Sequence, residues 1–178
     1  MKIEGTQEIT HPAHRVFAAL RDKSPELVPY MPNVEAMEVL SREDVGPVAH
    51  LYNKWQGSMS EVPTIARPFV SRDIAAWFDR ASWDESKLLC TWKLESVRAR
   101  EIFDCNGTTL VTEKGPDHST FTLTADLIIH AEKVPGVPRF LASKVQGPLE
   151  RFIANALRPN LTSVASAVQK YLDDHPEG

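Results

Sequence analysis

The sequence predicts an α+β domain in which seven strands pack against a long C-terminal helix. Apolar residues recur at steps of three and four through residues 148–173, the spacing of one helix face. From residue 33 to residue 130 the apolar pattern mostly has a period of two, which is typical of strands. Proline-marked helix starts lie between the first strand and the others. Because a long helix laid across a curved sheet encloses a pocket, this class predicts binding without identifying what is bound.

The N-terminal part of the chain is predicted to fold as a strand followed by two helices. The strand covers residues 2–10. Residues 12–22 follow as a helix, since a proline costs nothing at the first helical position. Ser24-Pro25-Glu26 begins a second helix, because a hydroxyl, an early proline and an acid near the positive end of the helix dipole favour a start. Pro29 and Pro32 limit this second helix to one or two turns.

Six further strands are predicted from the period of two, at residues 33–43, 48–55, 74–83, 87–95, 108–114 and 118–130. Residues 56–72 show no clear period and are predicted as a long connection. Asn106-Gly107 is predicted as a hairpin turn, because both residues tolerate a positive φ. Within the strands, two apolar faces stand out: Leu88, Cys90, Trp92 and Leu94 in one strand, and Phe121, Leu123, Ala125, Leu127 and Ile129 in another.

The C-terminal helix is predicted in two pieces. Pro138 begins the first piece, and Gly147-Pro148 marks a bend before the main helix. Pro159 removes a backbone hydrogen bond inside the main helix and is expected to kink it. The apolar stripe of the main helix consists of Leu149, Phe152, Ile153, Ala156, Leu157, Leu161, Val164, Val168 and Leu172.

Composition and charge exclude several classes of protein. A chain of 178 residues with 42% hydrophobic and 25% charged residues is predicted to form one domain, residues 1–178, and not a disordered or fibrous protein. A net charge of −4 and a pI near 5.9 argue against a general nucleic-acid binder, which needs a basic face. No window approaches the ~18 apolar residues of a membrane span, and no apolar signal segment is found near Met1. We therefore expect a cytoplasmic protein without an integral membrane segment.

The predicted order of elements resembles the helix-grip fold of the START-like superfamily. The residues that carry the resemblance are Thr10-His11-Pro12 through Leu20, Ser24-Pro25-Glu26, Asn106-Gly107-Thr108-Thr109 and the closing apolar stripe. The superfamily includes polyketide cyclases, pathogenesis-related allergens, lipid-transfer domains and heat-shock-ATPase activators. The resemblance covers nearly the whole chain and implies a seven-stranded antiparallel sheet wrapped on the C-terminal helix, with two short helices between the first two strands. A lipocalin-like barrel is the alternative, but the Gly-x-Trp it needs near the first strand is absent.

A fold of this kind is expected to hold a small hydrophobic ligand in an internal cavity. The candidate cavity-wall residues are large and apolar or aromatic, as ligand pockets require: Tyr52, Trp77, Trp92, Phe121, Leu123 and Phe152. Core and cavity wall share one face of the sheet in this fold. The same residues would therefore form a plain core if nothing were bound.

Asp79 and His50 are the candidate catalytic residues. Asp79 shares one face of its strand with Trp77, and on an inward face desolvation would raise the pKa of its carboxyl. On an outward face it would be a solvated charge. His50 shares a face with Tyr52, where it either orients a ligand carbonyl or makes a structural hydrogen bond. The pattern does not decide which face of residues 48–55 or 74–83 points inward.

The sequence predicts no metal and no cofactor. His11 and His14 are three residues apart but have no third ligand nearby in the sequence. No phosphate-binding glycine loop and no nucleophile-elbow motif is present. Cys90 and Cys105 have no metal or redox spacing and are predicted to be free thiols.

Three functions remain open at this point. The first is binding or transport of a lipid, a fatty-acid derivative or a polyketide. The second, implied by the resemblance, is a cyclase or aromatase in which Asp79 or His50 dehydrates a folded polyketone. The third is a protein-interaction module like the heat-shock-ATPase activators. The apolar inner strands favour binding over catalysis, and the sequence does not indicate an oligomeric state.

Overall fold

Seven strands form one antiparallel sheet in the order β1-β7-β6-β5-β4-β3-β2. The computed structural model describes residues 1–58, 73, 76–97, 103–130, 133, 147 and 163–176. The elements are β1 (Lys2–Ile9), α1 (Ala13–Asp22), α2 (Ser24–Leu27), the 3-10 helix η1 (Val28–Tyr30), β2 (Val34–Val45), β3 (Val48–Gly57), β4 (Ala76–Asp84), β5 (Leu89–Ser96), β6 (Phe103–Gly115), β7 (His118–Ile129) and a C-terminal helix at 163–174.

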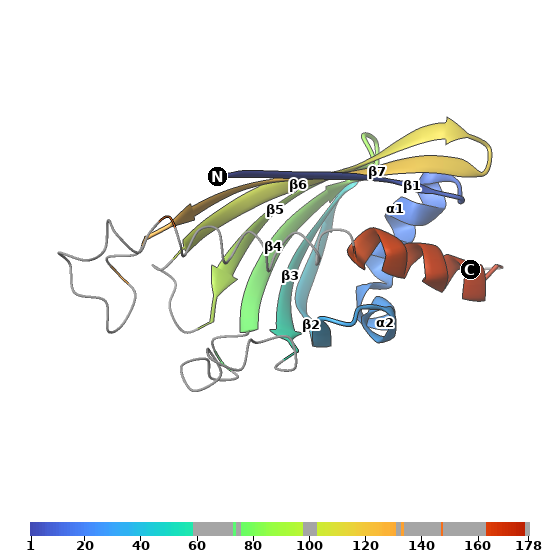
Figure 1. The fold of residues 1–178 in the computed structure, drawn as a ribbon. Coiled ribbons are helices and arrows are strands. Elements are labelled where there is room, and N and C mark those ends of the chain that lie inside the picture. The colour runs from blue at the N-terminus through green and yellow to red at the C-terminus, as the bar shows by residue number, and fades with distance from the viewer. Residues whose placement is uncertain are drawn as a thin grey trace.

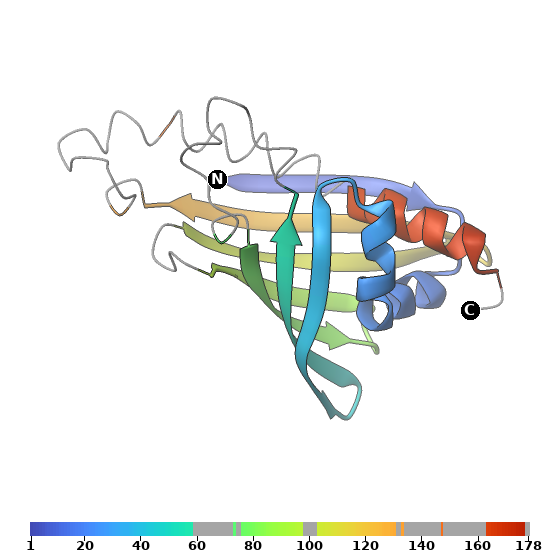
Figure 2. The same cartoon turned by 90° about the horizontal axis from the view of Figure 1, so that it is seen from below.

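This architecture confirms the predicted α+β class, with seven strands, two short helices between β1 and β2, and a helix near the C-terminus. Figures 1 and 2 show that the sheet is strongly curved and that α1, α2 and the C-terminal helix lie on its concave side, toward one end. The predicted bend at Gly147-Pro148 and the kink at Pro159 concern a part of the chain that falls almost wholly outside the described residues. So does most of the predicted connection at 56–72.

The hydrophobic core fills the space between the helices and the concave face of the sheet. Phe17 on α1 meets the Trp83 ring on β4 edge-on, with the ring centroids 5.3 Å apart. Beside them, the C-terminal helix contributes buried small and branched residues. The core cluster includes Ile3, Ile9, Val16, Leu20, Ala49, Leu51, Cys90, Val111, Phe121, Leu127, Ala165, Val168 and Leu172. Val168 and Leu172 of the predicted stripe are buried in this core, and Val164 is partly buried against it. Ala165, Ala167 and Tyr171, which the stripe did not include, are buried as well.

Polar contacts fix the C-terminal helix in place. The Gln169 side chain accepts a hydrogen bond from the Thr10 backbone N–H at 2.8 Å and donates one to its hydroxyl at 2.9 Å. The Tyr171 hydroxyl donates to Glu26 on α2 at 2.7 Å. His11 Nε2 lies 2.8 Å from Asp173 Oδ1, so this histidine pairs with the helix. These contacts come from residues far apart in the sequence, and they explain how the chain's last element is held against its first ones.

The prediction of a hairpin turn at Asn106-Gly107 is wrong. Both residues lie inside β6, where Gly107 faces Trp92 on β5 and Ala125 on β7. A Cβ atom added at Gly107 would lie 2.2 Å from Cζ2 of the Trp92 ring. The glycine is therefore required by the close approach of the indole, whose N–H donates to the Thr109 hydroxyl at 3.2 Å.

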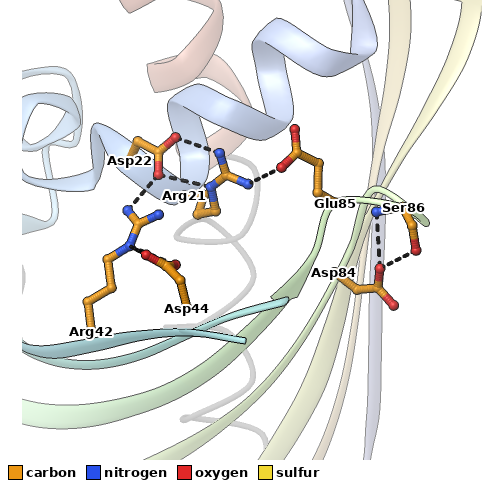
Figure 3. A network of polar contacts seen from close by, with 7 residues as sticks. All are labelled: Arg21, Asp22, Arg42, Asp44, Asp84, Glu85 and Ser86. Carbon is orange, nitrogen blue, oxygen red and sulfur yellow. Dashed lines mark hydrogen bonds and ion pairs between the residues drawn. The ribbon is translucent and has the colours of Figure 1, made fainter. Parts of the chain in front are cut away.

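A cluster of charged residues joins α1 to the sheet, as Figure 3 shows. Asp22 at the end of α1 accepts hydrogen bonds from Arg21, at 2.9 and 2.8 Å, and from Arg42 of β2, at 2.8 Å. Arg21 also reaches Glu85, after β4, at 2.9 Å, and Arg42 donates to Asp44 at 3.0 Å. The cluster therefore links three segments that are distant in sequence.

No helix among the described residues is long and apolar enough to span a membrane.

Candidate functional site

The structure decides which face of β3 and β4 is concave. Ala49 and Leu51 of β3 are buried in the core, so side-chain alternation places Asn53 and Trp55 on the same face. Asn53 is paired in register with Asp79 of β4. The concave face of β4 therefore carries Asp79 together with Trp77, Ala81 and Trp83.

Asp79 and Asn53 form a shielded polar pair on this apolar face. The Asn53 amide N–H₂ donates to Asp79 Oδ2 at 3.2 Å. The Asn53 side chain is 3% exposed, and its Oδ1 has no hydrogen-bond partner among the described residues. Asp79 Oδ1 is likewise shielded from solvent and unpartnered within the same set. Because an unsatisfied buried acceptor costs about 1–3 kcal/mol, two such atoms side by side need an explanation.

The charge on Asp79 is poorly compensated. Burial raises the pKa of its carboxyl from 3.8 to about 6, while hydrogen bonds from the side chains of Asn53 and Trp55 act in the opposite direction. No lysine or arginine in the described part of the chain forms an ion pair with it. The carboxyl can therefore both hold and release a proton near neutral pH.

Aromatic side chains flank this pair. The rings of Trp55 and Trp77 are parallel within 4°, with centroids 6.2 Å apart. Leu94 of β5 lies opposite Asp79, and Trp92 lies opposite Ala81. All four of these large side chains are half-buried, in contrast to the filled core around Trp83. This end of the concave face thus combines an apolar wall with hydrogen-bond acceptors.

The structure brings together some of the predicted site residues and separates others. Trp77 and Trp92 lie on the concave face near Asp79. Phe121 and Leu123, only 2% and 6% exposed, lie further across the sheet on β7, within the filled core. Phe152 lies outside the described residues.

Tyr52 and His50 lie on the convex face, opposite to Asp79. The Tyr52 ring stacks on Phe78 at a centroid distance of 5.3 Å, with the Arg80 guanidinium 4.2 Å from its centre. His50 is exposed, and its Nδ1 lies 2.9 Å from the Ser82 hydroxyl. Neither residue can touch a molecule bound beside Asp79, because the sheet lies between them.

Asn53 and Trp55 are the site residues that the sequence analysis missed. Side chains along their strand alternate between the two faces of the sheet, which places Asn53 on the same face as Ala49 and Leu51. That signal groups these residues but does not reveal that Asn53 lies beside Asp79, since 26 residues separate them. The pairing depends on the register between β3 and β4.

The two buried cysteines do not add a reactive nucleophile. Burial raises the pKa of the Cys105 thiol to about 11 and raises that of Cys90 further, with the nearby Asp79 carboxylate adding to the effect at Cys90. Both thiols are therefore poor nucleophiles. No cluster of three potential metal ligands occurs among the described residues.

Comparison with known proteins finds likeness in structure alone. No protein-family model matches the sequence, and no curated protein matches it. The protein TTHA0849 from Thermus thermophilus has a TM-score of 0.66 and 17% identity, over 96% of this chain and 99% of that one. The Zhui aromatase/cyclase from a Streptomyces species has a TM-score of 0.69 and 14% identity, and the match covers 100% of this chain and 98% of that one. Norcoclaurine synthase from Thalictrum flavum has a TM-score of 0.62 and 16% identity, and the match covers 98% of this chain and 87% of that one.

These likenesses establish the fold. The chain has the helix-grip fold that the order of elements predicted, and at these identities the likeness shows the fold alone. At such low identity a shared fold does not carry a shared activity. Function has to be argued from the residues of the concave face.

Proposed function

We propose that the chain is a single domain that binds a small hydrophobic ligand against the half-buried end of its concave face. The observation that carries the proposal is the pair of unpartnered, shielded oxygens on Asn53 and Asp79, set among half-buried aromatic rings. Pockets for small molecules are typically apolar with a few convergent polar groups. A bound molecule would cover the rings and offer a donor to the two oxygens.

Affinity would come mainly from apolar burial, at about 25 cal/mol per Å² removed from water. The polar pair would fix orientation, because a ligand without a donor would leave both oxygens unsatisfied. Trp77, Trp92 and Leu94, together with Trp55, form the wall in this proposal. Lipids, fatty-acid derivatives and polyketides are the classes expected from the sequence, and transport is one use of such binding.

The experiment is a titration with Nile red, an uncharged apolar dye whose fluorescence rises in apolar surroundings. Leu94→Trp adds bulk directly opposite Asp79 and should weaken dye binding at least tenfold. Leu110→Trp is the matched control, since Leu110 is 38% exposed on the convex face. Equal binding by the wild type and both variants, with unchanged thermal unfolding, would refute a site at this end of the concave face. If the dye binds as expected, native mass spectrometry of protein purified from its own host would identify the natural ligand.

A second candidate function is proton-transfer catalysis, as in a cyclase or dehydratase. It is favoured by the position of Asp79, whose pKa of about 6 suits a general acid or base near neutral pH. His50 takes no part in this version, because it lies on the other face of the sheet.

Deuterium exchange at the α-carbon of a bound aromatic ketone such as α-tetralone tests this candidate. The exchange rate should rise as the pH passes about 6, where Asp79 ionises. Asp79→Asn should slow it at least a hundredfold while Nile red still binds. An unchanged rate in the variant would leave binding as the function and remove Asp79 as a catalyst.

A further inference from the structure

The polar pair on the concave face offers acceptors and negative charge to a ligand. Asp79 Oδ1 and Asn53 Oδ1 both lack partners among the described residues, while the Asn53 amide nitrogen donates one of its two N–H groups to Asp79 Oδ2. The pair therefore has two acceptors without partners among the described residues, and one of them belongs to a carboxylate. A molecule that satisfies it must bring at least two N–H or O–H groups.

The number of donors distinguishes the possible ligand groups. A hydroxyl carries one donor and can satisfy one of the two oxygens. A carboxylate carries none and would be repelled by Asp79. A protonated amine carries two or three donors and no acceptor, so it can bond to both oxygens and neutralise the carboxylate at the same time.

The aromatic side chains around the pair also favour a cationic ligand group. The parallel rings of Trp55 and Trp77 lie beside the pair, and Trp is the side chain whose face attracts a cation most strongly. The convex face of the same strands supplies its own cations, with Arg80 over Tyr52. On the concave face, the residues described on β3, β4 and β5 include no lysine or arginine.

We propose that the Asn53–Asp79 pair binds the protonated amine of an amphiphilic ligand, whose apolar body lies along Trp55, Trp77 and Trp92. This inference rests on the proposed function and narrows it to one class of ligand. The ammonium group donates to Asp79 Oδ1 and Asn53 Oδ1, the two oxygens that lack partners among the described residues. The apolar body covers the half-buried rings.

Two pairs of compounds with matched apolar bodies test the proposal by displacement of Nile red at pH 7.5. They are 2-(2-naphthyl)ethylamine with 2-(2-naphthyl)ethanol, and decylamine with 1-decanol. In at least one pair the amine should bind the wild type at least tenfold more tightly than the alcohol. Asp79→Asn should reduce this preference to threefold or less. Asp126→Asn, an exposed aspartate of β7 on the convex face, is the matched control and should keep the full preference.

The outcomes separate the two proposals. If Nile red binds but the alcohols compete as well as the amines, or neither class competes, the amine site is overturned and hydrophobic binding stands. An amine preference that survives in Asp79→Asn overturns it as well. If Nile red does not bind the wild type, the proposed function itself fails. Thermal unfolding of each variant shows whether it is folded, and the Asp126→Asn control separates a specific effect from a general loss of charge.

Discussion

At the scale of single residues, Asp79 is the clearest case of a side chain placed at a cost to stability. Its carboxyl is shielded between Asn53 and Leu94, with one oxygen unpartnered in the described structure. A strand position of this kind usually carries an apolar residue. Retaining a carboxyl there is what a binding or catalytic role would require.

The stability cost of Asp79 can be measured through pH. Because its folded pKa of about 6 lies above the ordinary 3.8, the folded state holds this proton more tightly, so stability falls as pH rises from about 4 to 6. At about 1.4 kcal/mol per pKa unit, the full effect is roughly 3 kcal/mol. Asp79→Asn should therefore gain up to ~3 kcal/mol relative to wild type between pH 4 and pH 7.

Urea unfolding of both proteins at several pH values gives this difference directly. Taking the difference cancels the other carboxyls, including those whose pKa is lowered by ion pairs, such as Asp22. Cys90 of β5 shares the concave face with Asp79, but the pKa of its thiol is raised well above this range. Parallel stability curves for the two proteins would show that Asp79 is not desolvated in the folded chain.

Gly107 is a second residue whose substitution should have a clear effect on stability. Gly107→Ala places a methyl group 2.2 Å from a ring carbon of Trp92 and 2.4 Å from the Thr124 carbonyl oxygen. Overpacking of this kind typically costs about 1–3 kcal/mol or more. Gly5→Ala on β1 is the control, because nothing lies within 4 Å of its added Cβ. A drop in the urea midpoint for Gly107→Ala, with no drop for Gly5→Ala, is expected, and equal midpoints would contradict the close approach of the indole.

At the scale of elements, the charged cluster between α1, β2 and the residues after β4 fixes how the helix meets the sheet edge. Asp22 joins α1 to β2 through Arg42, and Arg21 joins α1 to Glu85. Partners held by several charges at once lose less entropy per contact than an isolated surface pair. The cluster is therefore expected to contribute more than a solvent-exposed pair does.

A double-mutant cycle with Asp22→Asn and Arg42→Gln measures this contribution. The two side chains are 31% and 38% exposed, so solvent screening limits the coupling free energy to about 0.5–1 kcal/mol. The coupling should fall when salt is raised to about 1 M, where the screening length is near 3 Å. The Lys23–Glu26 pair, with both side chains about half exposed, serves as the control and should show no measurable coupling. Coupling as small in the cluster as in this control would mean that the network adds nothing to stability.

At the scale of the whole molecule, the concave face has two parts with different character. Under α1 and the C-terminal helix it is a filled core, with Phe17 against Trp83. Toward the other end, Trp55, Trp77 and Leu94 remain half-buried. This division favours ligand binding at the end where burial is incomplete.

Ligand binding at that end should stabilise the entire domain. A molecule that binds the folded chain and not the unfolded chain adds about 2.7 kcal/mol at a concentration of 100 times its Kd. Thermal unfolding should therefore shift upward with decylamine or 1-decanol in the wild type, whichever binds, and the shift should shrink in Leu94→Trp. The same shift in wild type and Leu94→Trp would place the site elsewhere.

The sequence by itself determined the class and the order of elements, because these depend on local spacing. The period of two grouped Trp77 with Asp79 and grouped His50 with Tyr52, and both groups are correct as faces of their strands. The spacing of three and four in the C-terminal stripe identified Val168 and Leu172 as core residues. Such patterns involve only residues a few positions apart, so they can be recognised without knowing how the rest of the chain folds.

Only the tertiary structure decided which face of β3 and β4 is concave and which residues meet there. An alternating strand with two half-apolar faces can be turned either way, and the helices that cover one face come from the two ends of the chain. The contact between Asn53 and Asp79 depends on strand register, and the need for Gly107 depends on an indole from the neighbouring strand. Each of these is a relation between distant segments, and that is the physical reason local spacing could not reveal them.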